Sequence, residues 1–78
     1  MATEHIIIDP TVMLGKPCIA GTRITVEHVL RELAAGSTVE RLVRDYPRLT
    51  EADVRAALEF AANAVELERL YAPGDPAA

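Results

Sequence analysis

The fold is decided by residues 25–71, which read TVEHVLRELAAGSTVERLVRDYPRLTEADVRAALEFAANAVELERLY. Three hydroxyl side chains in this stretch stand where a helix can begin, because serine and threonine accept hydrogen bonds from the first unpaired backbone amides. They are Thr25, Ser37 and Thr50. Gly36 and Pro47 end the first two segments, since glycine leaves the helical conformation easily and proline cannot continue it. The stretch therefore predicts three helices in succession.

Two of these starts carry a second capping residue three positions later. Ser37 is followed by Glu40 and Thr50 by Asp53, the spacing of a capping box. Apolar residues recur at helical spacing along the first two helices: Val26, Val29, Leu30 and Leu33, then Val39, Leu42, Val43 and Tyr46. The third helix is predicted to be the longest and to end near Leu70.

The residues before Thr25 have a different composition. All five isoleucines lie at or before Ile24, whereas 11 of the 13 alanines follow Leu33. Isoleucine favours strands and alanine favours helices. Residues 6–8 predict a short strand that stops at the Asp9-Pro10 turn. The sequence therefore predicts an N-terminal β arm joined to a helical body.

A second turn divides the rest of the arm. The glycine and proline of Gly15-Lys16-Pro17 indicate a change of direction. Residues 11–14 and 18–20 flank this turn, and we expect both to be extended.

The chain is short, with 78 residues, and we expect one small domain without a large enclosed active site. That domain covers residues 1–71, with the arm at 1–24 and the helical body at 25–71. Residues 72–78 are predicted to be a frayed tail, because they have nothing to pack against.

Apolar runs are short, and the first residues, Met-Ala-Thr-Glu-His, lack the basic and apolar stretches of a secretion signal. A single cysteine, Cys18, cannot form a disulfide within the chain. We therefore expect a cytoplasmic protein with no membrane partner.

Charge is distributed unevenly along the chain. The net charge is −4, and residues 50–78 carry six acids and two bases, whereas the preceding residues are balanced. Proteins that bind nucleic acid usually present a basic face. The charge distribution therefore disfavours nucleic-acid binding as the main activity.

The third helix has apolar residues on two nearly opposite sides. One stripe consists of Val54, Leu58, Ala61 and Val65, and the other of Ala56, Phe60, Leu67 and Leu70. A three-helix domain needs only one such stripe, and we expect the stripe with Val54, Leu58 and Val65 to face the core. Either the arm folds over the second stripe or a partner chain covers it, and exchange of arms between two subunits would do both. We expect a homodimer with Phe60, Leu67 and Leu70 at the interface.

Few side chains indicate catalysis. His5, His28 and Cys18 lack the paired spacing of a metal site. Cys18 stands between Pro17 and Ile19, which is typical of a packed thiol rather than a nucleophile. The sequence predicts no enzyme activity, no cofactor or metal, and no small-molecule substrate.

Gly21-Thr22-Arg23 is a tight turn that presents an arginine just before the first helix. One interpretation is a simple connector with a surface arginine. The other is that Lys16 and Arg23, on two turns of one arm, form a cationic tip that binds an acidic partner.

The three capped helices have the outline of a helix-turn-helix domain. A basic cluster lies across the second helix and the turn after it: Arg41, Arg44 and Arg48. Either these arginines form a solvated surface or, together with Arg55, they contact DNA. Glu51 and Asp53 stand at the start of the third helix, where DNA phosphates would repel them.

Two stretches resemble a known family: GKPCIAGTRITVEHVLRELAAG, residues 15–36, and DYPRLTEADVRAALEFAA, residues 45–62. Their turns and caps occur in the order and at the spacing of the small prokaryotic family called domain of unknown function 433. The resemblance extends over residues 6–67, and Leu14 stands where many members have a second glycine.

The resemblance implies a fold and a role. Such members are homeodomain-like three-helix proteins with an N-terminal β arm, so we expect a mainly α, helix-turn-helix bundle. Many are antitoxins of the VapB kind, often encoded beside a PIN-like ribonuclease toxin. The resemblance therefore implies a type II antitoxin that binds and inhibits such a nuclease. PIN-like nucleases bind metal with carboxylates, so we expect Lys16 or Arg23 to supply a cation for that site and the face of Phe60, Leu67 and Leu70 to supply apolar area. The alternative is a helix-turn-helix transcriptional regulator that binds operator DNA.

Overall fold

The computed structural model describes residues 4–71, with side chains described for residues 4–67. This part of the chain is mainly helical, with three α-helices and one two-stranded antiparallel sheet, as the sequence predicts. The elements are β1 (Ile6–Ile7), a 3-10 turn η1 (Met13–Gly15), β2 (Cys18–Ile19), α1 (Val26–Ala34), α2 (Val39–Asp45) and α3 (Glu51–Tyr71). The expected tail, residues 72–78, lies outside the described residues.

The sheet attaches the arm to the helices. β1 and β2 pair with Ile6 opposite Ile19 and Ile7 opposite Cys18. Successive side chains of a strand point to opposite faces, so Ile6 is fully buried whereas Ile7 is 40% exposed. Ile6 and Ile19 belong to the same hydrophobic core as the helices. The arm therefore completes the core of the body.

The tip of the arm differs from the expectation. Residues 11–14 were expected to be extended, but the chain instead turns tightly through Met13, Leu14 and Gly15, whose φ angles are +50°, +59° and +81°. Positive φ is unfavourable for residues with a side chain. Leu14 is also 94% exposed. The side chain of Leu14 is thus exposed to solvent, and its backbone has a conformation that glycine would adopt more easily.

Two of the three predicted helix caps are confirmed. The Thr25 hydroxyl accepts a backbone amide of α1 at 2.9 Å. Thr50 and Asp53 form the predicted capping box, in which each side chain accepts the other's backbone amide at 3.1 Å. The predicted cap of α2 is wrong by one residue, because Thr38 rather than Ser37 accepts the amide, at 3.1 Å.

Ser37 has a different role, because it completes the end of α1. Gly36 takes a φ of +103°, and the amides of Gly36 and Ser37 donate to the carbonyls of Leu33 and Glu32 at 3.1 and 3.0 Å. This is the pattern of a Schellman motif. Since Ser37 is used at the end of one helix, the next helix begins one residue later.

The core-facing side of α3 also differs from the prediction. Val54 and Ala57 are buried, and Phe60, predicted for the opposite stripe, packs against the core. Leu58 and Val65, predicted to face inward, are 42% and 65% exposed. Apolar residues lie on several sides of this alanine-rich helix, so its own periodicity could not identify the packed side. The buried core consists of Ile6, Ile19, Val26, Val29, Leu42, Leu49, Val54 and Ala57.

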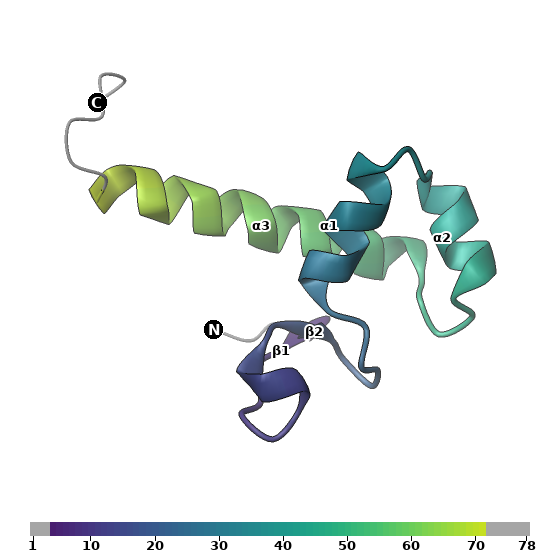
Figure 1. Cartoon of the computed structure of the whole chain (residues 1–78), viewed down its shortest axis with the longest axis horizontal. Coiled ribbons are helices and arrows are strands. Elements are labelled where there is room, and N and C mark those ends of the chain that lie inside the picture. The colour runs from purple at the N-terminus through teal and green to yellow at the C-terminus, as the bar shows by residue number, and fades with distance from the viewer. Residues whose placement is uncertain (1–3, 72–78) are drawn as a thin grey trace.

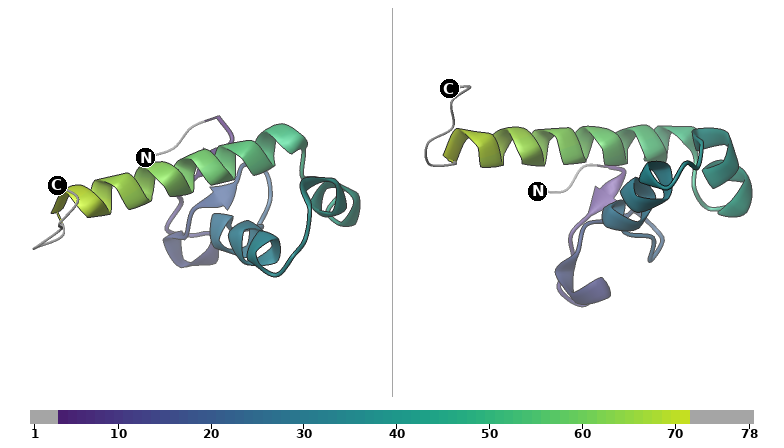
Figure 2. Two further views of the ribbon diagram at one scale, coloured as in Figure 1. Left: turned by 90° about the horizontal axis from the view of Figure 1, so that it is seen from above. Right: turned by 45° about the horizontal axis from the view of Figure 1, so that its top comes forward.

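The elements gather around one end of α3 (Figure 1). α1, α2 and β1 all contact this helix. The sheet and η1 lie to one side of α3, with η1 farthest from it (Figure 2). The C-terminal half of α3 extends beyond the other elements in every view.

No helix in residues 4–71 has both the length and the hydropathy needed to cross a bilayer.

Candidate functional site

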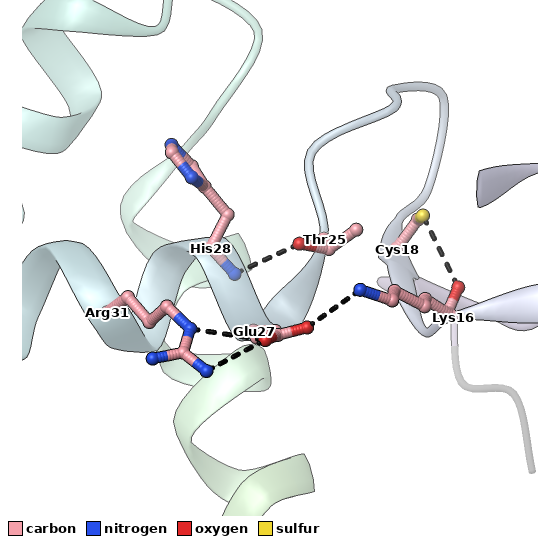
Figure 3. A network of polar contacts seen from close by, with 6 residues as sticks. All are labelled: Lys16, Cys18, Thr25, Glu27, His28 and Arg31. Atoms are coloured by element: carbon pink, nitrogen blue, oxygen red, sulfur yellow. Dashed lines mark hydrogen bonds and ion pairs between the residues drawn. The ribbon is translucent and has the colours of Figure 1, made fainter. Parts of the chain in front are cut away.

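Lys16 is engaged in a network with the outer face of α1 (Figure 3). Its Nζ lies 3.1 Å from Oε1 of Glu27, whose Oε2 accepts bonds from Nε and Nη2 of Arg31 at 3.1 and 3.0 Å. The hydrogen bond from Lys16, followed by that from Arg31, lowers the pKa of Glu27 below its ordinary value. Glu27 is therefore ionised and offsets the charge of Lys16.

Arg23 lies in a different environment. It lines a pocket of about 400 Å³ together with Arg48, which comes from the turn between α2 and α3. The Nη1 of Arg48 donates to the carbonyl of Gly21 at 3.2 Å, so the two loops lie against each other. Lys16 does not line this pocket. In the structure, Arg23 therefore shares a pocket with Arg48 and not with Lys16.

Neither arginine of this pocket is neutralised within the described part of the chain. No ion pair joins Arg23 or Arg48 to an acid of residues 4–67, whereas Lys16, Arg31, Arg44 and Arg55 all have one. Both arginines also line a neighbouring hollow of about 440 Å³. We call the first pocket, with these two side chains at its edge, the arginine notch.

Local hydrogen bonds hold the turn that carries Arg23. Gly21 takes a φ of +77°, which favours glycine. The Thr22 hydroxyl donates to the carbonyl of Ile19 at 2.8 Å and accepts from the amide of Ile24 at 3.0 Å. This turn therefore fixes the backbone from which Arg23 projects.

The remaining wall of the notch comes from the arm. Ile7 and Val12 supply apolar surface, whereas Ile19, which also lines the notch, is fully buried. Asp9 also lines the notch, and Thr11 donates to its carboxylate from the backbone amide at 2.8 Å and from the hydroxyl at 2.7 Å. These two bonds lower the pKa of Asp9, the backbone bond more than the hydroxyl bond. The notch thus combines two cations, one anion and apolar side chains.

The structure divides the predicted DNA-contacting arginines. Arg44 lies 3.7 Å from a carboxylate oxygen of Asp45, and Arg55 pairs with Glu51 one turn earlier on α3. Arg48 belongs to the arginine notch. Arg41 is exposed on α2 and has no ion pair with an acid of residues 4–67.

The acidic start of α3 is bonded to the arm. The Oδ1 of Asp53 lies 2.8 Å from Nδ1 of His5, and its other oxygen accepts from the Thr50 amide. Partial burial acts to raise the pKa of Asp53, but the bonds from His5 and Thr50 outweigh it and leave the pKa below its ordinary value. Asp53 therefore keeps a negative charge at the end of the helix that would enter a DNA groove.

An apolar groove of about 430 Å³ runs between α1 and α3, with Leu30 and Phe60 in its walls. Phe60 packs against the core, so only part of this predicted interface residue is available to a partner. Leu67 is 56% exposed on the projecting half of α3. The side chain of Leu70 lies outside the described residues.

The residues considered for metal binding or catalysis are dispersed. Cys18 is buried, and its thiol donates to the Lys16 carbonyl at 3.4 Å. His28 contacts Tyr46, with Nε2 2.9 Å from the hydroxyl. Within the described residues, no three His, Cys, Asp or Glu side chains gather as possible metal ligands.

The sequence did not predict that Arg23 and Arg48 line the same pocket. These residues are 25 positions apart, and their placement depends on the α2–α3 turn packing beside the Gly21 turn. No local pattern marks such a pair. A sequence signal did exist for Leu14, where many members of the resembled family have glycine.

The chain is similar to a family model, to a protein of known sequence and to a solved structure. The family model described as "Protein of unknown function (DUF433)" matches residues 6–61. The chain is 35% identical over 60 residues to "Uncharacterized protein y4eO" of Sinorhizobium fredii, covering 77% of this chain and 27% of that one. It is also similar to the crystal structure of a DUF433 member protein from Anabaena variabilis.

That structural similarity has a TM-score of 0.77 at 31% sequence identity and covers 82% of this chain and 63% of the Anabaena chain. The chain thus spans about a quarter of the length of the Sinorhizobium relative, at 27%. The match over residues 6–61 includes both turns of the arm, all of α1 and α2, and the packed part of α3. The chain belongs to the DUF433 family.

Proposed function

We propose that this protein is a non-catalytic, antitoxin-like partner of a PIN-like ribonuclease, which it binds and inhibits in the cytoplasm. The observation that carries the proposal is the exposure of large apolar side chains at two separate places. At the tip of the arm, Met13 and Leu14 are 43% and 94% exposed. On α3, Leu58, Val65 and Leu67 are 42%, 65% and 56% exposed. Apolar surface that the fold leaves uncovered is typical of a protein that binds another protein.

Charge adds a reason for this choice of partner. PIN-like nucleases hold metal ions with carboxylates, so an inhibitor that reaches this site needs a cation. Arg23 has no acidic partner among residues 4–67, so it is the stronger candidate. Lys16 remains a candidate, although Glu27 offsets its charge. An acidic protein, with a net charge of −4, also suits a nuclease whose RNA-binding surface is basic.

The proposal includes a homodimer. The groove beside Phe60 and the exposed Leu67 on the projecting half of α3 offer apolar area for a second copy. Leu70 was assigned to the same interface from the sequence. Light scattering at micromolar concentration is expected to give twice the 8.5 kDa of one chain, and a mass of one chain would contradict the dimer.

A second candidate function is transcriptional regulation by operator binding. Arg23, Arg41 and Arg48 have no ion pair with a described acid, and such arginines can contact phosphates. Each lost phosphate contact is expected to lower the slope of log affinity against log salt by about one. We expect the isolated protein to bind duplex DNA weakly, because Asp53 and Glu51 stand at the start of α3. Tight, sequence-specific binding without a partner would favour this function instead.

The decisive experiment uses the protein encoded by the adjacent gene, which we expect to be a PIN-like nuclease. The two chains are co-expressed with a tag on one of them, and RNA cleavage is then measured with the purified proteins. We expect co-purification and inhibition at stoichiometric ratio. Failure to bind any neighbouring nuclease would refute the proposed function.

Single substitutions then test the cationic residues. Arg23→Ala is expected to reduce inhibition more than Lys16→Ala, because Lys16 already forms an ion pair with Glu27. Both side chains are exposed, so the helical circular-dichroism signal and the melting temperature should stay nearly unchanged. Normal inhibition by both variants would show that inhibition depends on apolar contacts instead.

A further inference from the structure

We propose that the arginine notch is a single binding site for an acidic side chain of a partner protein. Arg23 and Arg48 would hold the carboxylate, and the apolar residue next to it in the partner would pack against Ile7 and Val12. This inference rests on the proposed function only for the identity of the partner, since the site itself is argued from the geometry of this chain.

Two cationic side chains line the notch. Arg23 and Arg48 come from loops on different parts of the chain and line the same pocket of about 400 Å³. Like charges that line one pocket repel each other. Neither arginine forms an ion pair with an acid of residues 4–67, and Asp9 brings a single negative charge to a pocket with two positive ones. A bound carboxylate would relieve this repulsion and accept charge-assisted hydrogen bonds.

Hydrogen bonds fix the two loops that carry these arginines. The bond from Arg48 to the Gly21 carbonyl links the two loops at 3.2 Å. The Thr22 hydroxyl bonds on both sides of the turn that carries Arg23. A site whose backbone is already fixed loses less conformational entropy when it binds.

The other residues that line the notch favour a carboxylate over a phosphate. Asp9 lines the same pocket, and the bonds from Thr11 keep it ionised. Because electrostatic attraction scales with the charge of the ligand, this negative charge reduces the advantage that two arginines alone would give a phosphate dianion over a carboxylate monoanion. Ile7 and Val12 also offer apolar surface, which suits an acidic residue beside an apolar one in a protein.

The test uses the full chain and two short peptides. N-acetyl-glutamyl-valine amide is titrated against nitrogen-15-labelled protein, and the arginine Nε–H signals are followed by NMR. N-acetyl-glutaminyl-valine amide serves as the neutral control. We expect the signals of Arg23 and Arg48 to shift saturably with the glutamyl peptide. The glutaminyl peptide should bind about tenfold more weakly, because it loses charge-assisted bonds.

Variants assign the effect to the notch. Arg23→Lys and Arg48→Lys keep the charge but lose the planar donor pair, and each is expected to weaken glutamyl binding by about tenfold. Arg31→Ala is the matched control, because it removes an arginine that pairs with Glu27 outside the notch. Equal shifts with both peptides, or equal weakening by Arg31→Ala, would refute the site. Inorganic phosphate that binds more tightly than the glutamyl peptide would overturn the assignment to a carboxylate.

The two proposals fail separately. If the glutamyl peptide binds the notch but the neighbouring nuclease does not bind the protein, the antitoxin role is refuted and the binding site is supported. If the protein inhibits the nuclease and Arg48→Lys inhibits as well as the unmodified chain does, the antitoxin role stands and the notch has no part in it. Loss of inhibition in Arg23→Lys and Arg48→Lys, with Arg31→Ala unaffected, would support both.

Discussion

Truncation of Ile6 to alanine tests whether the arm belongs to the core. Ile6 is fully buried, and it packs in the same cluster as Val54 and Ala57 of α3. Removing a buried isoleucine side chain down to alanine costs about 2–5 kcal/mol, partly because a cavity remains. A chain of 78 residues has a total stability of about 4–12 kcal/mol. The substitution should therefore remove a large fraction of the free energy of unfolding.

The next residue provides the matched control. Ile7 has the same side chain on the same strand, but it points to the opposite face and is 40% exposed. Ile7→Ala should therefore lower the free energy of unfolding by about 1 kcal/mol or less. Thermal unfolding followed by circular dichroism at 222 nm measures both variants. At about 4–8 °C for each kcal/mol in a domain of this size, Ile6→Ala should lower the melting temperature by roughly 8–40 °C. Similar losses in the two variants would refute the packing of the arm against α3.

Three other substitutions test separate features. Leu14→Gly should raise the free energy of unfolding by up to about 1 kcal/mol, because the φ of +59° suits glycine; Leu14→Ala keeps a Cβ and should give no gain, and equal melting temperatures for the two variants would count against backbone strain. Leu67→Glu should dissociate the proposed dimer in light scattering while leaving the helical signal intact, since Leu67 is 56% exposed; an unchanged dimer would exclude Leu67 from the interface. Asp53→Asn should destabilise the protein in urea titrations near neutral pH, because hydrogen bonds hold the folded-state pKa of this carboxyl below its ordinary value of 3.8. A group with a lowered folded-state pKa stabilises the fold above its unfolded-state pKa and loses that effect as pH falls through the folded-state value. The difference between Asp53→Asn and the unmodified chain should therefore shrink below about pH 4, and a difference independent of pH would contradict the assignment.

Local chemistry explains why the helix starts could be predicted. A cap needs only a side-chain oxygen and amides two or three residues later, and these are fixed by the sequence itself. Thr25, Thr50 and Asp53 therefore act as predicted. The cap of α2 was misplaced because Ser37 and Thr38 are adjacent and both are able to cap. The choice between them depends on how α1 ends, where the Ser37 amide closes the last turn.

The sequence by itself determined the order of elements, the two-part composition of arm and body, and the glycine and proline positions where helices stop. These features arise from contacts within a few residues. Tertiary structure alone decided which side of α3 is buried, because this helix carries alanine and larger apolar residues on several sides. Only the packing of Ile6 and of the other two helices against α3 selects Val54 and Ala57 as buried residues. It also decided the partners of the charged side chains. Lys16 pairs with Glu27, 11 residues away, and Arg23 and Arg48, 25 residues apart, line one pocket. Such distant residues come close only after the packed core has brought the loops together.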